Sequence, residues 1–446
     1  MFSTADTIVA VATPPGRGGL GVVRLSGPNA HAIARRLTTH ASPFSPYRAT
    51  FTSISIDRSP IDHVVVTFFP CPKSYTGEDI VELSAHGSAI VLRAVVAEAI
   101  DEGARLAEPG EFTLRAFLNG RIDLTQAEAV ADLIDAVTPL QARVAFDQLQ
   151  GTLTGVIGVI ADALFDLMAR LEASVDFPDE GYHFLEPDDL KTALEQLVAR
   201  TSQLIADSKR GRLVREGFQV AIVGKPNVGK SSLFNALVGA SRSIVTSIPG
   251  TTRDLLVDVV DINGFRVTLV DTAGLRPTDD EIEAEGVSRA RQAIISSDLV
   301  LVVVDCSQPL DQRDCEIVNQ ISDNKRLIVS NKCDIGRSPS DEHVGVSART
   351  GEGLDVLRQR LIAALDVEPT FDRPAISNLR HIKLVEHAHA ALTRARDSVA
   401  TEKELLPEEF VLADLQQAQA ALDEVSGRRA PDDLLNHIFS RFCVGK

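Results

Sequence analysis

One eight-residue motif, G-K-P-N-V-G-K-S at Gly224–Ser231, constrains this chain more than any other feature. It matches G-x-x-x-x-G-K-[ST], a pattern in which backbone amides curl around phosphates at the start of a helix. The apolar run Val220–Val223 precedes it and the helical pattern Ser231–Leu237 follows it. This context predicts a strand, a phosphate-binding loop and a helix, in which Lys230 reaches the outer phosphates and Ser231 ligates magnesium.

Four further motifs follow in the order typical of nucleotide switches. Thr251-Thr252 can complete the magnesium shell, and Asp271 opens a D-T-A-G motif at the end of an apolar run. Asn331-Lys332-Cys333-Asp334 also follows an apolar run, and its final carboxylate can accept two hydrogen bonds that guanine offers and adenine does not. Ser347-Ala348 supplies a backbone donor to the guanine carbonyl. Together the motifs predict a domain that binds and hydrolyses GTP.

The predicted nucleotide contacts come from these motifs and from the loop that precedes Asp254. They are Asn227, Val228, Gly229, Lys230, Ser231, Ser232, Thr246, Ser247, Ile248, Pro249, Gly250, Thr251, Thr252, Asp271, Thr272, Ala273, Gly274, Asn331, Lys332, Asp334, Ser347 and Ala348. Among them Lys230 and Thr252 are expected to take part in catalysis, and Ser231 and Thr252 to hold magnesium.

Leu275 stands where small GTPases that resemble Ras carry a water-orienting Gln. Because Leu has no polar group, another residue must orient water, and another charge must stabilise the transition state. The charged residues near the loop are candidates: Arg242, Arg253, Arg276, Asp279, Asp280, Glu281 and Glu283.

Hydrophobic periodicity divides the chain into regions of different character. Short apolar runs alternate with helical segments in the middle of the chain, which is typical of a parallel sheet covered on both faces; the runs are Val220–Val223, Val267–Val270, Leu299–Val304, Leu327–Val329 and Val344–Val346. Helical spacing dominates from Leu124 to about Leu171, from Leu190 to Ile205, and from Ile376 onward with breaks at Pro407 and Pro431.

We therefore expect a multidomain α/β and all-α protein. An α+β domain covers residues 1–120, with a helix near Ser88–Glu102. A helical bundle domain is assembled from two chain segments, 121–212 and 371–446. A Ras-like P-loop domain with a doubly wound parallel sheet, residues 213–370, is inserted between them.

Composition excludes several classes of protein. The 446 residues carry a net charge of −17, which argues against non-specific coating of nucleic acid. The 5 Cys residues are scattered without a C-x-x-C pair, so neither a disulfide framework nor a structural zinc site is expected. We found no 18-residue apolar run and no basic, apolar leader, and we expect a cytoplasmic protein that does not contact a membrane.

Motifs along the whole chain resemble the MnmE (TrmE) family of bacterial tRNA-modification GTPases. Besides the P-N variant of the phosphate loop, they are D-T-I-V-A at Asp6–Ala10, A-T-P-P-G-R-G-G at Ala12–Gly19, Y-T-G-E-D at Tyr75–Asp79, P-G-E-F-T at Pro109–Thr113, R-A-F-L-N-G at Arg115–Gly120, G-T-T-R-D at Gly250–Asp254 and the closing F-C-V-G-K at Phe442–Lys446. The resemblance implies a homodimer joined by its N-terminal domains, which bind a 5-formyl or methylene derivative of tetrahydrofolate. It implies a flavin-dependent partner of the MnmG (GidA) kind, with which an aminomethyl or carboxymethylaminomethyl group is added to the wobble uridine of certain tRNAs. The resemblance also implies that potassium activates GTP hydrolysis. It further implies that two GTPase domains meet when GTP is bound.

Site residues follow from the resemblance position by position. It implies that potassium is held by Asn227 and by the carbonyls of Thr246, Ile248 and Thr251, and that Glu283 orients the attacking water through a second water. For folate it implies Arg24, Glu82, Arg121 and Lys446. Glu78 is an alternative to Glu82, and Arg121 replaces a Lys of relatives.

Two questions stay open at this point. Cys443 is either a small packing residue or, as the resemblance implies, a residue needed for modification, and we do not assign it as a nucleophile. The second concerns function, because ribosome-assembly GTPases share G-x-P-N-V-G-K-S and D-T-A-G-L. Those proteins usually append a basic RNA-binding module, whereas the regions flanking the expected GTPase domain here are neutral or acidic.

Overall fold

The computed structural model describes residues 5–445 except 57–58, 177–186, 241–255, 272–293, 322–324, 337–341, 366–375 and 401–407. Contacts group the chain into two units. The first contains Met1–Ala131, Leu149–Ala161 and Gln419–Lys446, and the second contains Asp132–Gln148 and Asp162–Ala418. The predicted division into four segments stays a prediction.

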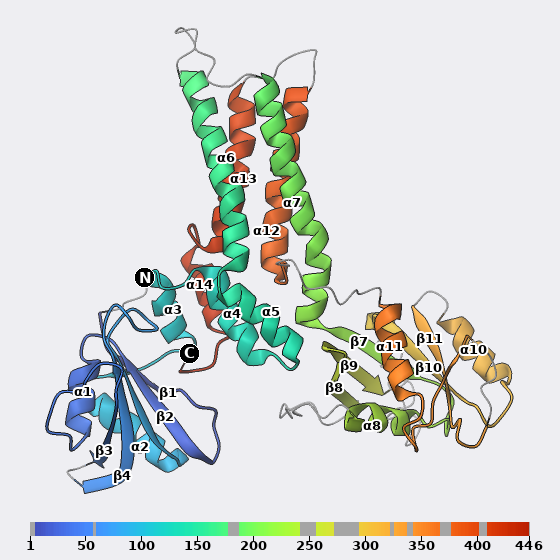
Figure 1. Cartoon of the computed structure of the whole chain (residues 1–446), viewed down its shortest axis with the longest axis horizontal. Helices are drawn as coiled ribbons and strands as arrows, with labels where there is room; N and C mark the ends of the chain where they lie inside the picture. The colour runs from blue at the N-terminus through green and yellow to red at the C-terminus, as the bar shows by residue number, and fades with distance from the viewer. Residues whose placement is uncertain are drawn as a thin grey trace, which may run out of the picture. The chain divides into compact units, whose positions relative to one another are not determined.

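The first unit is built on a mixed sheet with the strand order β3-β4-β5-β2-β1-β6. Its elements are β1 (Ile8–Val11), β2 (Gly18–Ser26), α1 (Ala30–Leu37), β3 (Ala49–Ile56), β4 (Ser59–Phe69), β5 (Ile80–Gly87), α2 (Ala89–Asp101), β6 (Arg105–Leu106), α3 (Glu111–Leu118), α4 (Leu124–Asp135) and α14 (Asp432–Phe439). All pairs are antiparallel except β1 with β6. Helices α1 and α2 bury apolar residues such as Ile33 and Val95 against strand residues such as Leu83 (Figure 1). This is the α+β character expected for the region.

A second apolar cluster brings the end of the chain back to this unit. Leu124 and Val130 of α4 and Leu114 of α3 pack with Phe439 of α14 and with Phe442 beyond it. Phe442 begins the closing F-C-V-G-K motif, so this packing fixes where the motif leaves the core.

The second unit contains the predicted α/β sheet and long helices. Its elements are α5 (Pro139–Leu149), α6 (Thr152–Asp176), α7 (Pro187–Glu216), β7 (Phe218–Val223), α8 (Lys230–Ala240), β8 (Leu256–Ile262), β9 (Phe265–Asp271), β10 (Leu299–Asp305), α10 (Gln312–Gln320), β11 (Arg326–Asn331), β12 (Val344–Gly345), α11 (Leu354–Ala364), α12 (Leu379–Ala400) and α13 (Glu408–Ser426). Helices α4, α6 and α13 contribute residues to both units. Helices α7 and α12 lie side by side, joined by a hydrogen bond of 2.9 Å between Thr201 Oγ1 and His389 Nδ1 (Figure 1).

The sheet of the second unit has the order β12-β11-β10-β7-β9-β8. All five predicted strands are present and mutually parallel. The prediction of a purely parallel sheet was incomplete, because β8 pairs antiparallel with β9 at one edge. The two strands form a hairpin through Asn263 and Gly264, both with positive φ. An alternating edge strand of this kind carries a weaker apolar signal than the buried strands.

One sequence expectation about helices needs correction, and a second needs a comment. The helical stretch from Leu124 to about Leu171 is three helices, because Pro139 starts α5 and Gly151 takes a positive φ of 80° before α6. We also expected no membrane-spanning segment. Within the described residues one helical stretch, Thr152–Ser174, is long and apolar enough to cross a membrane, with a mean hydropathy of 1.6. One such helix is weak evidence, since core helices of soluble proteins meet the same criterion.

Candidate functional site: a nucleotide loop and a C-terminal tail pocket

The phosphate loop follows β7, the strand that lies between β10 and β9. Three loop residues have positive φ: Gly224 at 149°, Asn227 at 67° and Gly229 at 96°. A Cβ on Gly224 would lie 2.3 Å from the Val303 carbonyl oxygen, and one on Gly229 would lie 2.3 Å from Asn331 Nδ2. Both positions therefore require glycine.

Neighbouring side chains hold the loop by its carbonyl oxygens. Lys230 Nζ donates to the carbonyls of Gly224 and Lys225, each at 2.8 Å. Asn331 Nδ2 donates to the Val228 carbonyl at 2.9 Å, and Lys332 Nζ to the Asn227 carbonyl at 2.8 Å. With its carbonyls held this way, the loop can present its amide N–H groups to an anion at the start of α8.

Lys230, Ser231 and Asp271 meet beside this loop. The Ser231 hydroxyl donates to Asp271 Oδ2 at 2.9 Å, and Asp271 is fully buried at the end of β9. Burial lowers the pKa of Lys230, and the negative charge of Asp271 opposes that effect. A hydroxyl beside a carboxylate is an oxygen donor pair of the kind magnesium prefers, so these residues fit a magnesium ion accompanied by phosphates.

The guanine motif lies at the ends of β11 and β12. Asp334 Oδ1 accepts a hydrogen bond of 2.7 Å from the Ser347 hydroxyl, and Oδ2 pairs with Arg349 at 2.7 Å. The Ser347 hydrogen bond and the nearby Arg349 hold the pKa of Asp334 below its ordinary value, so the carboxylate is ionised at neutral pH. Of the Ser347-Ala348 pair, which we expected to supply a backbone donor to the guanine carbonyl, the Ala348 amide donates to Asn331 Oδ1 at 3.1 Å.

The structure brings together the described members of the predicted nucleotide set, which are Asn227, Val228, Gly229, Lys230, Ser231, Ser232, Asp271, Asn331, Lys332, Asp334, Ser347 and Ala348. Several predicted residues lie outside the described residues: Thr246, Ser247, Ile248, Pro249, Gly250, Thr251, Thr252, Thr272, Ala273, Gly274, Glu283 and Lys446. Among the described residues, no group of three or more His, Cys, Asp or Glu side chains is arranged to hold a metal ion.

Arg24 and Glu82 form the centre of a second site, in the first unit. They are register partners on β2 and β5, with Arg24 Nη2 at 2.8 Å from Glu82 Oε1. The Arg24 guanidinium carbon lies 5.9 Å from the ring centroid of Tyr75 and 5.7 Å from that of Phe112. Arg24 Nη1 also donates to the Gly445 carbonyl at 3.4 Å. The last residues of the chain therefore reach a cluster of charged and aromatic groups.

The C-terminal tail is fixed at several points on the way to the Arg24–Glu82 cluster. Val444 forms a β-bridge with Pro109, and the Gly110 amide donates to the Cys443 carbonyl at 3.4 Å. A Cβ on Gly445 would lie 2.4 Å from the Val11 carbonyl oxygen, so only glycine fits there. The side chain of Cys443 is exposed, which does not support a role in core packing. Arg121 is exposed and lies against Gly77, in the loop that also carries Tyr75.

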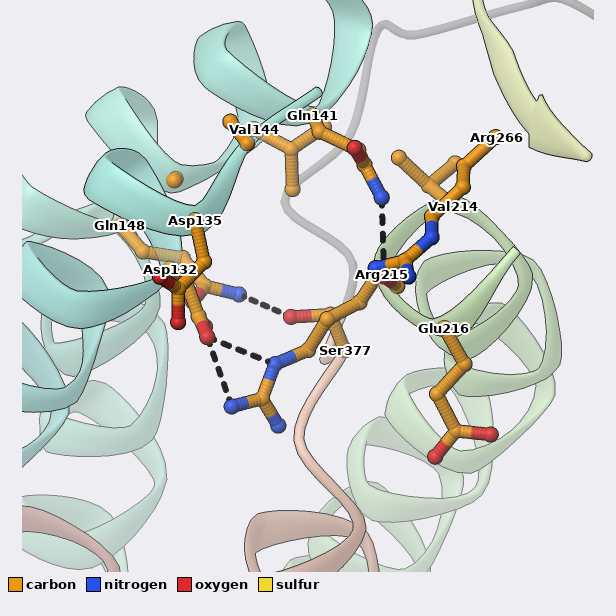
Figure 2. Close-up of a pocket in the computed structure, with 12 residues that line it drawn as sticks. Asp132, Asp135, Gln141, Val144, Gln148, Val214, Arg215, Glu216, Arg266 and Ser377 are labelled. Carbon is orange, nitrogen blue, oxygen red and sulfur yellow. Dashed lines mark hydrogen bonds and ion pairs between the residues drawn. The ribbon is translucent and has the colours of Figure 1, made fainter. Parts of the chain in front are cut away.

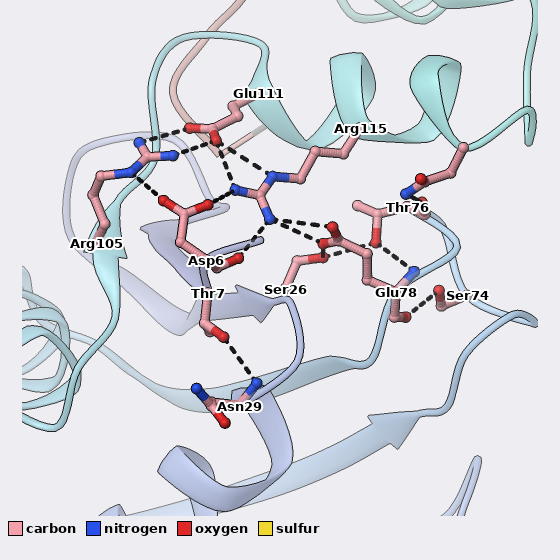
Figure 3. A network of polar contacts seen from close by, with 11 residues as sticks. Asp6, Thr7, Ser26, Asn29, Ser74, Thr76, Glu78, Arg105, Glu111 and Arg115 are labelled. Atoms are coloured by element: carbon pink, nitrogen blue, oxygen red, sulfur yellow. Dashed lines mark hydrogen bonds and ion pairs between the residues drawn. The ribbon is translucent and has the colours of Figure 1, made fainter. Parts of the chain in front are cut away.

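A buried ionic network explains what Glu78 does (Figure 3). Arg115, 1 % exposed, pairs with Asp6 at 2.7 Å, Glu111 at 2.9 Å and Glu78 at 3.2 Å. Glu78 also accepts a hydrogen bond of 2.7 Å from the Ser26 hydroxyl. Its carboxylate is thus engaged inside the unit, whereas that of Glu82 faces Arg24.

A cavity of about 250 Å³ lies elsewhere in the second unit, among the ends of α4 and α7, helix α5, and β9 (Figure 2). Arg215 pairs with Asp132 at 2.7 Å, and the Arg215 carbonyl accepts from Gln141 Nε2 at 2.9 Å. Leu140 and Val144 of α5 pack on the apolar core of the sheet. None of the predicted site residues lines this cavity. The cavity lies where these helices pack against the sheet, and it is distinct from the nucleotide site.

Sequence reasoning missed several residues that shape these sites. Arg349 pairs with Asp334 but follows the S-A motif by a single position and belongs to no pattern. Lys225 occupies a variable position of the phosphate loop, yet it forms ion pairs with Asp311 and Asp314. No motif or spacing signals either contact, and those of Lys225 join segments nearly ninety residues apart.

Comparisons with known proteins agree with the resemblance. A family model described as the MnmE helical domain matches residues 124–443, and one described as the GTP-binding protein TrmE N-terminus matches residues 7–121. A protein of Koribacter versatilis named tRNA modification GTPase MnmE is 44 % identical over 99 % of both chains. A protein of the same name from Bordetella petrii is 42 % identical over 100 % of this chain and 99 % of its own.

Solved structures also resemble part of the chain. Era of Aquifex aeolicus bound to GDP and aluminium fluoride is 29 % identical, covering 42 % of this chain and 68 % of its own with a TM-score of 0.28. At that score the likeness carries no structural argument. The family models and the full-length relatives are sufficient: the chain belongs to the MnmE (TrmE) family of tRNA modification GTPases and is a GTP hydrolase.

Proposed function

We propose that this chain is a potassium-activated GTPase that gates a folate-dependent modification of the wobble uridine in certain tRNAs. The observation that carries the proposal is the joint presence of two sites in one chain. A phosphate loop faces a guanine-binding motif in the second unit, and the C-terminal tail reaches the Arg24–Glu82 pair in the first. A nucleotide switch alone would have no use for the second site.

At the nucleotide site each residue has a physical task. Lys230 would exchange the loop carbonyls for the outer phosphates, and Ser231, Thr252 and Asp271 are the residues that would hold magnesium, Asp271 through water. Magnesium, when bound, neutralises charge that builds up on the phosphoryl oxygens. Asp334 selects guanine. Its lowered pKa keeps the carboxylate ionised, so it can accept two hydrogen bonds.

Potassium activation accounts for the missing catalytic Gln. Lys332 holds the Asn227 carbonyl, and Asn227 is an exposed residue of the phosphate loop whose side-chain amide oxygen can serve as a cation ligand. The carbonyls of Thr246, Ile248 and Thr251 complete the proposed shell. A bound monovalent cation supplies fixed positive charge where an arginine would otherwise be donated. Glu283 then orients the attacking water that Leu275 cannot bind.

The Arg24–Glu82 pocket is proposed to hold the tetrahydrofolate derivative together with Arg121 and Lys446. Its charged and aromatic groups suit a heterocycle that bears amino and carbonyl groups and is joined to a tail that carries carboxylates. Because the carboxylate of Glu78 is engaged by Arg115 and Ser26, we favour Glu82 as the glutamate that contacts the folate. The folate, when bound, supplies the one-carbon unit, and Cys443 is an exposed residue of the tail whose Gly445 carbonyl accepts a hydrogen bond from Arg24.

The remaining elements of the proposal are a homodimer joined through N-terminal domains, a flavin-dependent partner similar to MnmG (GidA), and a cytoplasmic location. They are supported by full-length similarity to proteins named tRNA modification GTPase MnmE. In this proposal two GTPase domains meet when GTP is bound, and the cycle of their meeting and GTP hydrolysis gates the modification.

The test uses the host cell and the purified full-length chain. Deletion of the gene should remove the wobble-uridine modification measured by mass spectrometry of digested tRNA, and the wild-type chain should restore it. Lys230→Met and Arg24→Met should each fail to restore it, while the purified Arg24→Met chain still hydrolyses GTP. Fully modified tRNA in the deletion strain would contradict the proposal.

A further inference from the structure

Lys225, the second residue of the phosphate loop, makes contacts that the loop motif does not require. Its Nζ lies 2.8 Å from Asp311 Oδ2 and 2.7 Å from Asp314 Oδ2. Both carboxylates belong to the start of α10, where Asp311 is the N-cap and forms a capping box with Asp314. The loop that binds phosphate is therefore tied to the N-terminus of a helix that contributes nothing else to the predicted site.

The charge arrangement at this helix end indicates that the contact is specific. A helix N-terminus carries partial positive charge, which disfavours a nearby lysine. Asp314 is 5 % exposed, and a carboxylate that is buried requires a counter-charge as well as hydrogen bonds. Asp314 Oδ2 accepts from the Asp311 amide at 3.1 Å, and Lys225 supplies the charge. The two ion pairs hold the pKa of Lys225 above its ordinary value.

The chain segment between β10 and α10 also supports a second part of the phosphate loop, at Asn227. Lys332 bonds both to the Asn227 carbonyl and to Asp305, the last residue of β10. Asp305 and Asp311 bound the segment between β10 and α10. The start of the phosphate loop is held through Lys225, and its middle, at Asn227, is held through Lys332. The segment 305–311 therefore supports both parts of the loop.

This matters when Lys230 changes partners. Its ammonium group is bonded to the carbonyls of Gly224 and Lys225, and it must release both to reach a phosphate. The start of the loop, Gly224 and Lys225, then loses those two hydrogen bonds, and the ion pairs of Lys225 remain to hold it.

We propose that Lys225 is a positioning residue for the nucleotide, and that its ion pairs with Asp311 and Asp314 keep the phosphate loop in the shape that binds GTP and GDP. Lys225 acts through the backbone of its own loop and touches no phosphate. The proposal rests on nucleotide binding by the loop. Without the tether, the loop populates other shapes, and the apparent affinity falls by the fraction that remains competent.

The test compares Lys225→Met with Asp314→Asn in the full-length chain. The amide of Asp314→Asn can still accept from the Asp311 amide, so this variant keeps the helix cap and loses the charge. Each variant should raise the dissociation constants of GDP and GTP and the KM for GTP roughly three- to tenfold, as expected for the loss of a charge-assisted hydrogen bond. The value of kcat at saturating GTP should stay within about twofold, because the bound loop regains its shape.

Three controls separate positioning from a structural effect. Lys225→Arg should recover most of the affinity. The double variant should be no weaker than Lys225→Met alone, because Lys225→Met already removes the ion pair that Asp314→Asn breaks. Arg212→Met, which breaks an exposed ion pair with Glu216, should leave affinity unchanged.

Each outcome is decisive. Lys225→Met with wild-type dissociation constants overturns the tether, as do additive losses in the double variant or a fall in kcat without a change in KM. A wild-type chain that fails to bind GTP would instead remove the proposed function on which the tether rests.

Discussion

Replacing Arg115 by Met removes the cation that three carboxylates share inside the first unit. Arg115 contacts Asp6, Glu78 and Glu111 and is 1 % exposed, so water cannot take its place. Arg105 still pairs with Asp6 and Glu111, but Glu78 loses its charged partner. Removing one partner of a buried ion pair costs about 3–5 kcal/mol, whereas the exposed pair of Arg36 with Glu102 contributes about 0–1 kcal/mol.

The loss should depend on pH in a defined direction. Burial raises the pKa of Glu111, but hydrogen bonds from Arg105, the Glu108 amide and Arg115 lower it by more, so it ends below its ordinary value of 4.5. A carboxyl whose pKa is lowered on folding stabilises the folded state above its unfolded pKa. That contribution is lost as the pH falls through the lowered folded value. The difference between wild type and Arg115→Met should therefore be full at pH 7 and shrink below about pH 4.5.

Hydrogen exchange measured by mass spectrometry is the appropriate assay, because a chain of two units does not unfold in one step. Peptides from β1, β5 and α3 should exchange roughly a hundredfold faster or more in Arg115→Met at pH 7, while peptides from β7 and β10 stay unchanged. Arg36→Met is the matched control and should alter exchange little. Wild-type protection in the Arg115→Met peptides would refute the reasoning, as would a loss that is the same at pH 4 and pH 7.

Three predictions concern the proposed sites. Asn227→Ala should abolish the faster hydrolysis of GTP in potassium than in sodium, since it removes the proposed cation ligand, and an unchanged ratio of the two rates would remove that assignment. Glu283→Ala should slow turnover at least roughly tenfold while the dissociation constant for GTP stays nearly constant, because affinity rests on loop amides and Lys230; a parallel loss of affinity would make Glu283 structural. Arg24→Met should weaken binding of 5-formyltetrahydrofolate, measured by calorimetry, at least roughly tenfold without changing GTP hydrolysis; equal folate affinity would exclude Arg24 from the pocket.

The nucleotide site was predictable because its determinants are local. Each motif combines a strand end with a short loop, and the geometry of a parallel sheet brings such ends to one edge. Gly224 and Gly229 could be assigned their roles from spacing alone, and the structure gives the steric reason.

The parts that escaped prediction depend on contacts between distant segments. Lys225 and Asp314 lie in unrelated sequence patterns. Neither pattern shows that the start of α10, which follows β10, lies next to the phosphate loop. The strand β8 was missed because it is an edge strand with a mixed burial pattern. The choice between Glu78 and Glu82 was open in the sequence, because only the fold shows which carboxylate faces Arg115 and which faces Arg24.

The central claim is that the Asp334 loop makes this chain a guanine nucleotide hydrolase, and a change of base specificity tests it most directly. The wild-type chain should hydrolyse GTP and leave ATP and xanthosine triphosphate nearly untouched. Asp334→Asn presents one donor and one acceptor, which complement the carbonyl and N–H of xanthine. In that variant kcat/KM should fall for GTP and rise for xanthosine triphosphate, changing their ratio by about a hundredfold or more. A variant that still prefers GTP, or a wild-type chain that uses ATP equally well, would contradict the account.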